Sequence, residues 1–327
     1  MKLGLLGCGR IGQVHARSLS RIAEARIVAV ADAVPEAAQT LAARAGAEVR
    51  GSEEIIAAPD IDAVIVATPT TLHFEQIHAI AAAGKAIFCE KPIDLSAERA
   101  AQCQQAVEAA GVPFLTAFNR RFDPSFAHLH DQVRDGAIGE IEMVVITSRD
   151  PALPPISYIE SSGGLFRDMM IHDFDMARFL LGEEPIEIHA VGSCLVDPAI
   201  GAAGDIDTAM VTLRTASGRL CQINNSRRAT YGYDQRIEVH GSKGMLQAAN
   251  QPAHLVTQAS GGGFTAARSM DFFLERYEAA YLAEMTHFVD AVTRGSPLKA
   301  TIADGVAAQR LADTADTARK TGKVLSL

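Results

Sequence analysis

The 327-residue chain has no long hydrophobic run, no excess of basic residues and no closely spaced pair of cysteines. No stretch approaches the roughly 20 consecutive apolar residues that a membrane-spanning helix needs. Lysine and arginine number 30 against 39 acidic residues, which gives a formal net charge of −9. Because this acidity leaves no basic surface for a nucleic-acid backbone or an anionic membrane, we expect neither as a partner.

The cysteines are odd in number and widely spaced: Cys8, Cys89, Cys103, Cys194 and Cys221. Because no CxxC occurs, the pattern supports neither a disulfide framework nor a zinc site, and we expect buried, reduced thiols and no metal. The apolar run Leu3–Cys8 is shorter than the ~7–15 residues of a signal peptide's hydrophobic core. Arg10 follows it at once. We therefore expect a cytoplasmic protein that begins directly with a strand.

The length and composition predict a globular protein of two domains, at 1–120 and 121–327. Apolar residues make up 48% of the chain and charged residues 21%, which is near the globular average. In the first domain, apolar runs alternate with segments rich in Ala, Glu and Gln, and such repeated βα units imply a doubly wound parallel sheet. The expected strands are Lys2–Leu6, Arg26–Ala31, Asp62–Thr68, Ala86–Glu90 and Pro113–Ala117, and the helices are Pro35–Ala45, Thr71–Ala83 and Ser96–Ala110.

The second domain shows a different rhythm, typical of an α+β domain with one antiparallel sheet. Its expected helices are Asp123–Asp135, a long one at Gly164–Leu181, and two closing helices, Tyr277–Arg294 and Ile302–Lys320. The expected strands are Glu140–Ser148, Ile186–Val196, Asp207–Thr215, Arg219–Ser226, Arg236–His240 and Met245–Ala248.

A dinucleotide-binding loop is predicted at Gly7–Gly12, which reads GxGxxG, follows the first strand and opens a helix. Gly7 allows a tight turn, Gly9 lets the backbone approach a pyrophosphate, and Gly12 allows close packing of helix and strand. Arg10 and Ile11 lie in the same loop. Asp32 stands at the end of the second strand, 20 residues beyond Gly12. Its carboxylate can accept the ribose hydroxyls and repel a 2′-phosphate, which favours NAD over NADP, although Arg10 could offset part of that repulsion.

Thr68 and His73 follow the third of these strands and are expected to line the nucleotide, because ligands bind at the carboxyl ends of parallel strands. The segment could equally be an ordinary proline turn before a helix. Glu90 and Lys91 stand at the carboxyl end of the next strand and point to the same edge, although a lysine is by default a solvated surface charge.

On the long predicted helix, Asp168 and His172 are four residues apart and share a face, with Asp175 seven residues beyond Asp168. A carboxylate beside an imidazole on an otherwise apolar helix suggests a polar cavity. The alternatives are a helix-stabilising pair, a satisfied buried histidine, or metal ligands, although no third ligand stands at a suitable spacing.

Seven motifs together resemble the Gfo/Idh/MocA oxidoreductases, and within them the bacterial inositol 2-dehydrogenases. The similarity spans essentially the whole chain. The Glu-Lys-Pro motif combined with Asp-x-x-x-His is specific for the family, and the Ser-Arg-Asp-Pro and Tyr-Gly-Tyr-Asp-Gln-Arg segments favour the inositol enzymes. The motifs are Gly7–Gly12, Ala67–Thr70, Glu90–Pro92, Asn119–Asp123, Ser148–Pro151, Gly163–Asp175 and Tyr231–Arg236.

The resemblance implies a catalytic trio of Lys91, Asp168 and His172 that converges beside the nicotinamide of NAD. His172 would remove a hydroxyl proton as the hydride leaves, Asp168 would orient the imidazole, and Lys91 would stabilise the developing alkoxide. The implied fold is a Rossmann domain plus an α+β domain with a large open, mostly antiparallel sheet. In this family that sheet commonly mediates dimers or tetramers, and the proline of the Glu-Lys-Pro motif is often cis.

The resemblance also implies a polyol substrate, with myo-inositol oxidised to 2-keto-myo-inositol (scyllo-inosose). Arg121, Asp150 and Tyr231 are candidate substrate contacts by motif position. Tyr233 could exchange roles with Tyr231, and Arg121 could instead form a structural salt bridge, for example with Asp123. Another inositol isomer or a pyranose is the neighbouring alternative. A non-catalytic NAD-binding redox regulator is a different class, and the intact trio argues against it.

Overall fold

The computed structural model describes residues 1–327, and the chain divides into two compact units. The first unit contains Met1–Asp123 and Ala279–Arg310, and the second contains Pro124–Glu278 and Leu311–Leu327. This division differs from the expected 1–120 and 121–327, because the later segment Ala279–Arg310 packs with the first unit. None of the helices combines the length and the apolar character needed to cross a membrane.

The first unit is built on a six-stranded parallel sheet in the order β3-β2-β1-β4-β5-β6. Its central strands are completely buried apolar runs, as expected for a sheet covered on both faces. The strands are β1 (Lys2–Leu6), β2 (Arg26–Ala31), β3 (Glu48–Val49), β4 (Ala63–Val66), β5 (Ala86–Cys89) and β6 (Phe114–Thr116).

Helices connect these strands or pack beside them. They are α1 (Arg10–Leu19), α2 (Pro35–Ala45), α3 (Ser52–Ala57), α4 (His73–Ala82), α5 (Ala97–Ala110) and most of α12 (Glu278–Arg294), with short 3₁₀ helices η1 (Thr70–Leu72) and η2 (Asn119–Phe122). Two contacts explain why the late segment belongs here. The Thr116 backbone donates to the Ala300 carbonyl at 3.0 Å, and Phe288 packs edge-on against Phe88 at 5.5 Å.

The second unit contains a seven-stranded sheet in the order β12-β11-β7-β10-β9-β8-β15. The pairing is antiparallel except between β7 and β10, so the sheet is mostly antiparallel, as the resemblance implies, rather than entirely so. The strands are β7 (Ile141–Arg149), β8 (Pro185–Ser193), β9 (Thr208–Thr215), β10 (Leu220–Ser226), β11 (Asp234–Gly241), β12 (Gly244–Ala248) and β15 (Leu325–Ser326).

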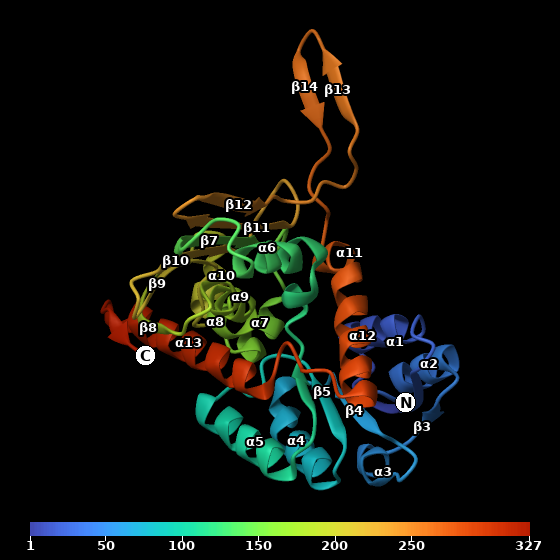
Figure 1. Cartoon of the computed structure of the whole chain (residues 1–327). Helices are drawn as coiled ribbons and strands as arrows, with labels where there is room; N and C mark the ends of the chain where they lie inside the picture. Colours follow the sequence, from blue (N-terminus) through green and yellow to red (C-terminus); the bar gives the residue numbers. More distant parts are fainter. The chain divides into compact units, whose positions relative to one another are not determined.

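One face of this sheet packs against helices, and α9 contacts both β7 and β10. The unit's helices are α6 (Pro124–Arg134), α7 (Ile156–Ser162), α8 (Leu165–Asp168), α9 (Ile171–Leu181), α10 (Pro198–Ala202) and α11 (Phe273–Arg276), while α13 (Ile302–Thr321) crosses the division between the units. A hairpin of β13 (Thr257–Ser260) and β14 (Gly263–Ala266) extends away from the sheet (Figure 1).

The long helix expected at Gly164–Leu181 is wrong, because the structure has two helices, α8 and α9, separated at Met169 and Met170. The Met170 amide donates to the Leu165 carbonyl five residues back, and the Asp173 amide donates to the Met170 carbonyl only three residues back. The regular i to i−4 pattern is therefore interrupted. Asp168 ends one helix and His172 lies in the first turn of the next, so the expected shared face of one continuous helix does not exist.

Candidate active site

The three glycines of the GxGxxG loop occupy the positions that a dinucleotide site needs. Gly7 has a positive φ of 95°, and a Cβ added there would lie 2.4 Å from the Ala67 carbonyl oxygen. A Cβ at Gly12 would lie 2.0 Å from the Gly7 carbonyl oxygen, so only glycine allows the helix to start this close to the strand. A Cβ at Gly9 would meet nothing within 4 Å, which leaves open space above the loop.

The start of α1 can hold the phosphates of a dinucleotide. Gly9 is its N-cap residue, and no side chain caps the free N–H groups of the first turn. Those groups and the helix dipole favour an anion at this end. Asp32, directly after β2, fixes the loop, because its carboxylate accepts the Cys8 amide at 2.6 Å and the Val34 amide at 2.8 Å. The residues present therefore fit a nucleotide whose ribose lies at Asp32.

His73 is buried, and both of its ring nitrogens lie close to backbone carbonyl oxygens. It is 1% exposed, and its Nε2 and Nδ1 lie 3.0 and 2.9 Å from the carbonyl oxygens of Thr68 and Pro92. Burial, the largest influence, lowers the pKa of this imidazole. The Thr68 hydroxyl donates to Gln76 at 2.6 Å. His73 thus joins two loops at the carboxyl ends of β4 and β5, and its ring is engaged by backbone.

The Glu-Lys-Pro segment follows β5 at the same edge of the sheet. The Lys91–Pro92 peptide bond is cis, as is common in the family that the sequence resembles. The Glu90 carboxylate lies 2.7 Å from Nε2 of His15, a fully buried residue of α1. The structure therefore brings the segment that carries Lys91 together with the helix that starts at the glycine loop, within the first unit.

In the second unit, both oxygens of the Asp168 carboxylate are bound by side chains that the sequence interpretation did not include. Oδ1 accepts the Tyr158 hydroxyl at 2.7 Å, and Oδ2 lies 3.2 Å from Nη2 of Arg227. The Arg227 side chain is only 2% exposed and also lies 3.9 Å from Asp205. Burial, and then proximity to the Asp168 carboxylate, raise the pKa of Tyr158. The two side-chain contacts hold the Asp168 carboxylate in one orientation.

His172 lies in the first turn of α9, which is anchored to the sheet by the next residue. Asp173 is completely buried and accepts the Ser148 hydroxyl at 2.5 Å and the Asn225 side-chain amide at 2.9 Å. Ser148 is on β7 and Asn225 on β10, so two strands fix the start of the helix. Asp175, the third acidic residue singled out on this segment, is also fully buried.

The three candidate substrate contacts lie in different settings. Arg121 is 5% exposed, and its guanidinium lies 3.0 Å from Asp304 and donates to the Lys299 carbonyl at 2.5 Å. This ion pair favours the structural alternative for Arg121, with Asp304 as a partner. Asp150 directly follows β7, and its amide donates to the Ser226 carbonyl at 2.9 Å.

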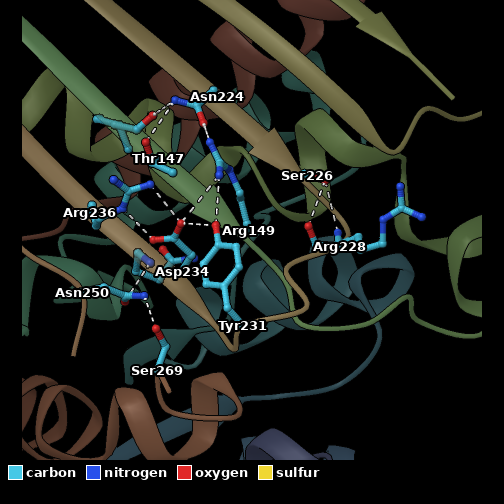
Figure 2. A network of polar contacts seen from close by, with 12 residues as sticks. Thr147, Arg149, Asn224, Ser226, Arg228, Tyr231, Asp234, Arg236, Asn250 and Ser269 are labelled. Atoms are coloured by element: carbon cyan, nitrogen blue, oxygen red, sulfur yellow. Dashed lines mark hydrogen bonds and ion pairs between the residues drawn. The ribbon is translucent and has the colours of Figure 1, made fainter. Parts of the chain in front are cut away.

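Tyr231 belongs to the polar network that Figure 2 shows. Strand alternation places this network on the sheet face opposite α9. Its hydroxyl donates to Asp234 at 2.6 Å and accepts from Arg149 at 3.0 Å. Arg236 also binds Asp234, at 2.8 and 3.0 Å. Neighbouring residues on a strand point to opposite faces, so Arg149 faces away from its neighbour Ser148, which binds α9. Tyr233, the alternative, is buried beside Tyr277.

Neither Tyr158 nor Arg227 carried a sequence signal for its contact with Asp168, because Tyr158 lies on a different helix and Arg227 is 59 residues away along the chain. All five cysteines are free, and four are buried as expected, whereas Cys194 is partly exposed. The structure contains no group of three or more His, Cys, Asp or Glu side chains arranged to hold a metal ion.

Comparison with known families matches residues 1–118 to an oxidoreductase family with an NAD-binding Rossmann fold, and residues 126–247 to the GFO/IDH/MocA C-terminal domain. An inositol 2-dehydrogenase from Rhizobium meliloti (strain 1021) is 55% identical over 96% of both chains. The chain belongs to the Gfo/Idh/MocA oxidoreductase family. A myo-inositol 2-dehydrogenase from Thermotoga maritima is 45% identical, covering 93% of this family member and 92% of the relative.

A solved structure supports the cofactor assignment for this Gfo/Idh/MocA member. A scyllo-inositol dehydrogenase from Lactobacillus casei, with bound NAD(H) and scyllo-inositol, has a TM-score of 0.93 and 30% identity. The alignment covers 100% of this chain and 98% of that one. Together with the NAD-binding Rossmann family and the fit of Gly9 and Asp32, this confirms an NAD-dependent oxidoreductase of the predicted fold class.

Proposed function

We propose that this chain oxidises myo-inositol at C2 with NAD⁺, forming 2-keto-myo-inositol (scyllo-inosose) and NADH. The observation that carries the proposal is its high identity, over nearly the full length, to relatives named for inositol 2-dehydrogenation. Another inositol isomer or a pyranose remains the alternative substrate, since one structural relative is named for scyllo-inositol.

The proposed chemistry assigns one task to each of three side chains. NAD⁺, when bound, accepts the hydride that no side chain can accept. His172 takes the proton of the substrate hydroxyl, Lys91 donates to the same oxygen as negative charge develops, and Asp168 stabilises the charged imidazole. The contacts of Asp168 with Tyr158 and Arg227 support this role, because they restrain the orientation of the carboxylate.

The remaining expected site residues are proposed in two groups. Gly7, Gly9, Arg10, Ile11, Gly12, Asp32, Thr68, His73, Glu90 and Lys91 form or support the cofactor site. Asp150 is proposed to bind substrate hydroxyls. The same role is proposed for Arg121 and Tyr231, which also contact Asp304 and Arg149 respectively.

The test is NADH formation by the native protein with myo-inositol, scyllo-inositol, chiro-inositol and glucose. We expect the highest kcat/KM with myo-inositol. His172→Ala should lower kcat by about 10²–10⁴-fold while the Kd for NADH changes little, and Lys91→Met should lower kcat by about 10²-fold. A preference for another polyol would contradict only the proposed identity of the substrate, not the proposed reaction. NADH binding without turnover of any polyol or sugar would instead favour the redox regulator.

We also propose a homo-oligomer, either a dimer or a tetramer. The sheet face opposite α9 exposes large apolar side chains, each 43–56% exposed: Met143, Val191, Met210, Leu220 and Met245. The β13–β14 hairpin adds Leu255, Val256 and Phe264, which are 70–91% exposed. Such surfaces are typical of interfaces between subunits. Light scattering after gel filtration tests this, and a monomer at micromolar concentration would contradict it.

A cytoplasmic location is proposed as well. All five cysteines are free thiols, which a reducing compartment preserves. Cell fractionation with an antibody to the native protein tests the location, and recovery outside the cytoplasm would contradict it.

A further inference from the structure

Both neighbours of Lys91 are held by buried histidines from different helices. His15 of α1 is fully buried, and its Nε2 lies 2.7 Å from Oε1 of Glu90. His73, the first residue of α4, is 1% exposed, and its Nδ1 lies 2.9 Å from the carbonyl oxygen of Pro92. The residues immediately before and after Lys91 are therefore each fixed by an imidazole.

We propose that His15 and His73 are positioning residues that fix the backbone of Lys91 for reaction. The inference rests on the proposed function, in which the Lys91 ammonium stabilises charge on the substrate oxygen. Such stabilisation depends on distance, because a donor must sit close to the position where charge develops. A lysine side chain is long and flexible, so holding its backbone restricts where the ammonium can reach.

The surroundings of His15 make it a rigid support. Its ring packs edge-on against Phe88 at 4.8 Å and against Tyr281 at 6.0 Å. Phe88 is on β5, the strand that leads into Glu90, so the ring is fixed against the same element whose end it holds. His15 also lies three residues after Gly12, on the helix whose first turn is proposed to hold the cofactor phosphates. One helix thereby supports both the cofactor loop and the segment that carries Lys91.

The His73 ring lies between two carbonyl oxygens, and its single N–H can donate a hydrogen bond to only one of them. Its Nε2 lies 3.0 Å from the Thr68 carbonyl oxygen, and neither this carbonyl nor that of Pro92 can donate a hydrogen bond. Because burial lowers the pKa of His73, the ring is neutral near pH 7 and carries one N–H. The proposal requires this proton on Nδ1, where it binds Pro92 rather than Thr68.

Substitution by glutamine or asparagine distinguishes the contacts of the two ring nitrogens, because each amide replaces only one of them. The glutamine amide nitrogen can occupy the position of Nε2, whereas the shorter asparagine places its nitrogen near Nδ1. His15→Gln therefore keeps a donor for Glu90 and His15→Asn does not. At the other histidine the order reverses, since His73→Asn keeps the donor for Pro92 and His73→Gln keeps only the contact with Thr68.

We expect His15→Asn and His73→Gln to lower kcat for polyol oxidation by about 10- to 100-fold, as a displaced catalytic group does. His15→Gln and His73→Asn should recover most of that loss. The Kd for NADH, measured by fluorescence titration, should change by less than about threefold in the two His15 variants, because His15 is not one of the residues assigned to the cofactor site. Equal kcat in His73→Asn and His73→Gln would overturn the role of His73.

His78 provides a matched control on the same helix. It donates to the Phe74 carbonyl of its own helix at 2.8 Å and makes no contact with the Lys91 segment. His78→Asn should leave kcat within about twofold of the native value. A loss as large as that of His73→Gln would mean that any disturbance of α4 lowers activity, and would overturn the inference.

A double-mutant cycle distinguishes positioning of Lys91 from a general structural role. Adding His15→Asn or His73→Gln to Lys91→Met should change kcat by less than about twofold, because the group being positioned is already gone. A full additional loss would contradict the inference. The two proposals fail separately, since native kcat in Lys91→Met would contradict the role of Lys91, whereas native kcat in the histidine variants alone would contradict only the positioning.

Discussion

Alanine substitutions at two glycines of the same loop should affect different properties. Gly12→Ala should lower thermal stability, and Gly9→Ala should weaken cofactor binding. In the structure, a Cβ at Gly12 would lie 2.0 Å from the Gly7 carbonyl oxygen, whereas a Cβ at Gly9 would meet no atom within 4 Å. Gly9 has φ −68° and ψ −165°, an extended conformation that alanine adopts without strain. The two substitutions therefore add the same methyl group, at Gly12 in a crowded position and at Gly9 in an open one.

For Gly12→Ala the backbone must move, and overpacking of this kind costs about 1–3 kcal/mol. We expect the Tm without nucleotide to fall by roughly 2–6 °C, using about 2 °C per kcal/mol for a chain of this size. For Gly9→Ala we expect a change of less than about 1 kcal/mol in the free energy of unfolding. Its methyl group instead occupies the space into which the pyrophosphate must come, so the Kd for NADH should rise at least about tenfold, or 1.4 kcal/mol.

Thermal unfolding of the nucleotide-free proteins and NADH fluorescence titration measure the two quantities independently. Native NADH affinity in Gly9→Ala would refute the position assigned to the cofactor. Native Tm in Gly12→Ala would refute the close approach between α1 and the end of β1.

Three further predictions concern other parts of the chain. Asp32→Asn should reduce the ratio of kcat/KM for NAD to that for NADP at least about tenfold, because the charge that repels a 2′-phosphate is removed, and a native preference for NADP would contradict this reasoning. Burial, and then Lys299, lower the pKa of His287, whose Nε2 accepts the Lys299 amide at 3.0 Å. As pH falls below about 6.5, the unfolded chain binds a proton before the native state does, so the free energy of unfolding falls by at most about 1.4 kcal/mol per pH unit. His287→Gln should therefore flatten the decline in Tm between about pH 7 and 5. An unchanged slope would exclude His287 as a cause of the decline. Arg227→Met should lower the free energy of unfolding by about 3 kcal/mol, since it leaves the Asp168 charge without its buried partner, and adding Asp168→Asn should recover part of the loss; no recovery would show that the ion pair is not the reason.

The order of the Rossmann elements could be predicted from the sequence because local signals agree with the final environment. The strand Arg26–Ala31 and the helix Pro35–Ala45 have the predicted bounds. The helix starts at a proline and ends at Gly46 in the left-handed conformation, and both residues mark helix ends in sequence. The strand β3 and helix α3 were not predicted, because Glu48–Val49 and Ser52–Ala57 are too short to show a period.

The break between α8 and α9 could not be predicted in the same way. Neither Met169 nor Met170 is a helix breaker, and the interruption contains no proline or glycine. Asp173 is fixed by Ser148 and Asn225 from two strands, so tertiary contacts rather than propensity set the start of α9. A pattern of four-residue spacing cannot reveal such contacts.

The candidate site also contains parts that the sequence could predict and parts that it could not. The glycine loop and Asp32 form a local unit of strand, turn and helix, so their roles follow from spacing alone. The contacts of Asp168 with Tyr158 and Arg227 join three separate elements, and those of His15 and His73 join α1 and α4 to a distant loop. Residues from other elements that hold a proposed catalytic group carry no local signal, and only the fold identifies them.

The most direct test of the central claim uses myo-inositol carrying deuterium at C2. Because NAD⁺ takes the hydride from the oxidised carbon, the account predicts deuterium in the nicotinamide ring of the reduced cofactor and slower single-turnover reduction than with unlabelled substrate. Unlabelled NADH formed at the native rate would show that another carbon is oxidised, and no reduced cofactor from a protein that binds NAD⁺ would contradict the proposed reaction altogether.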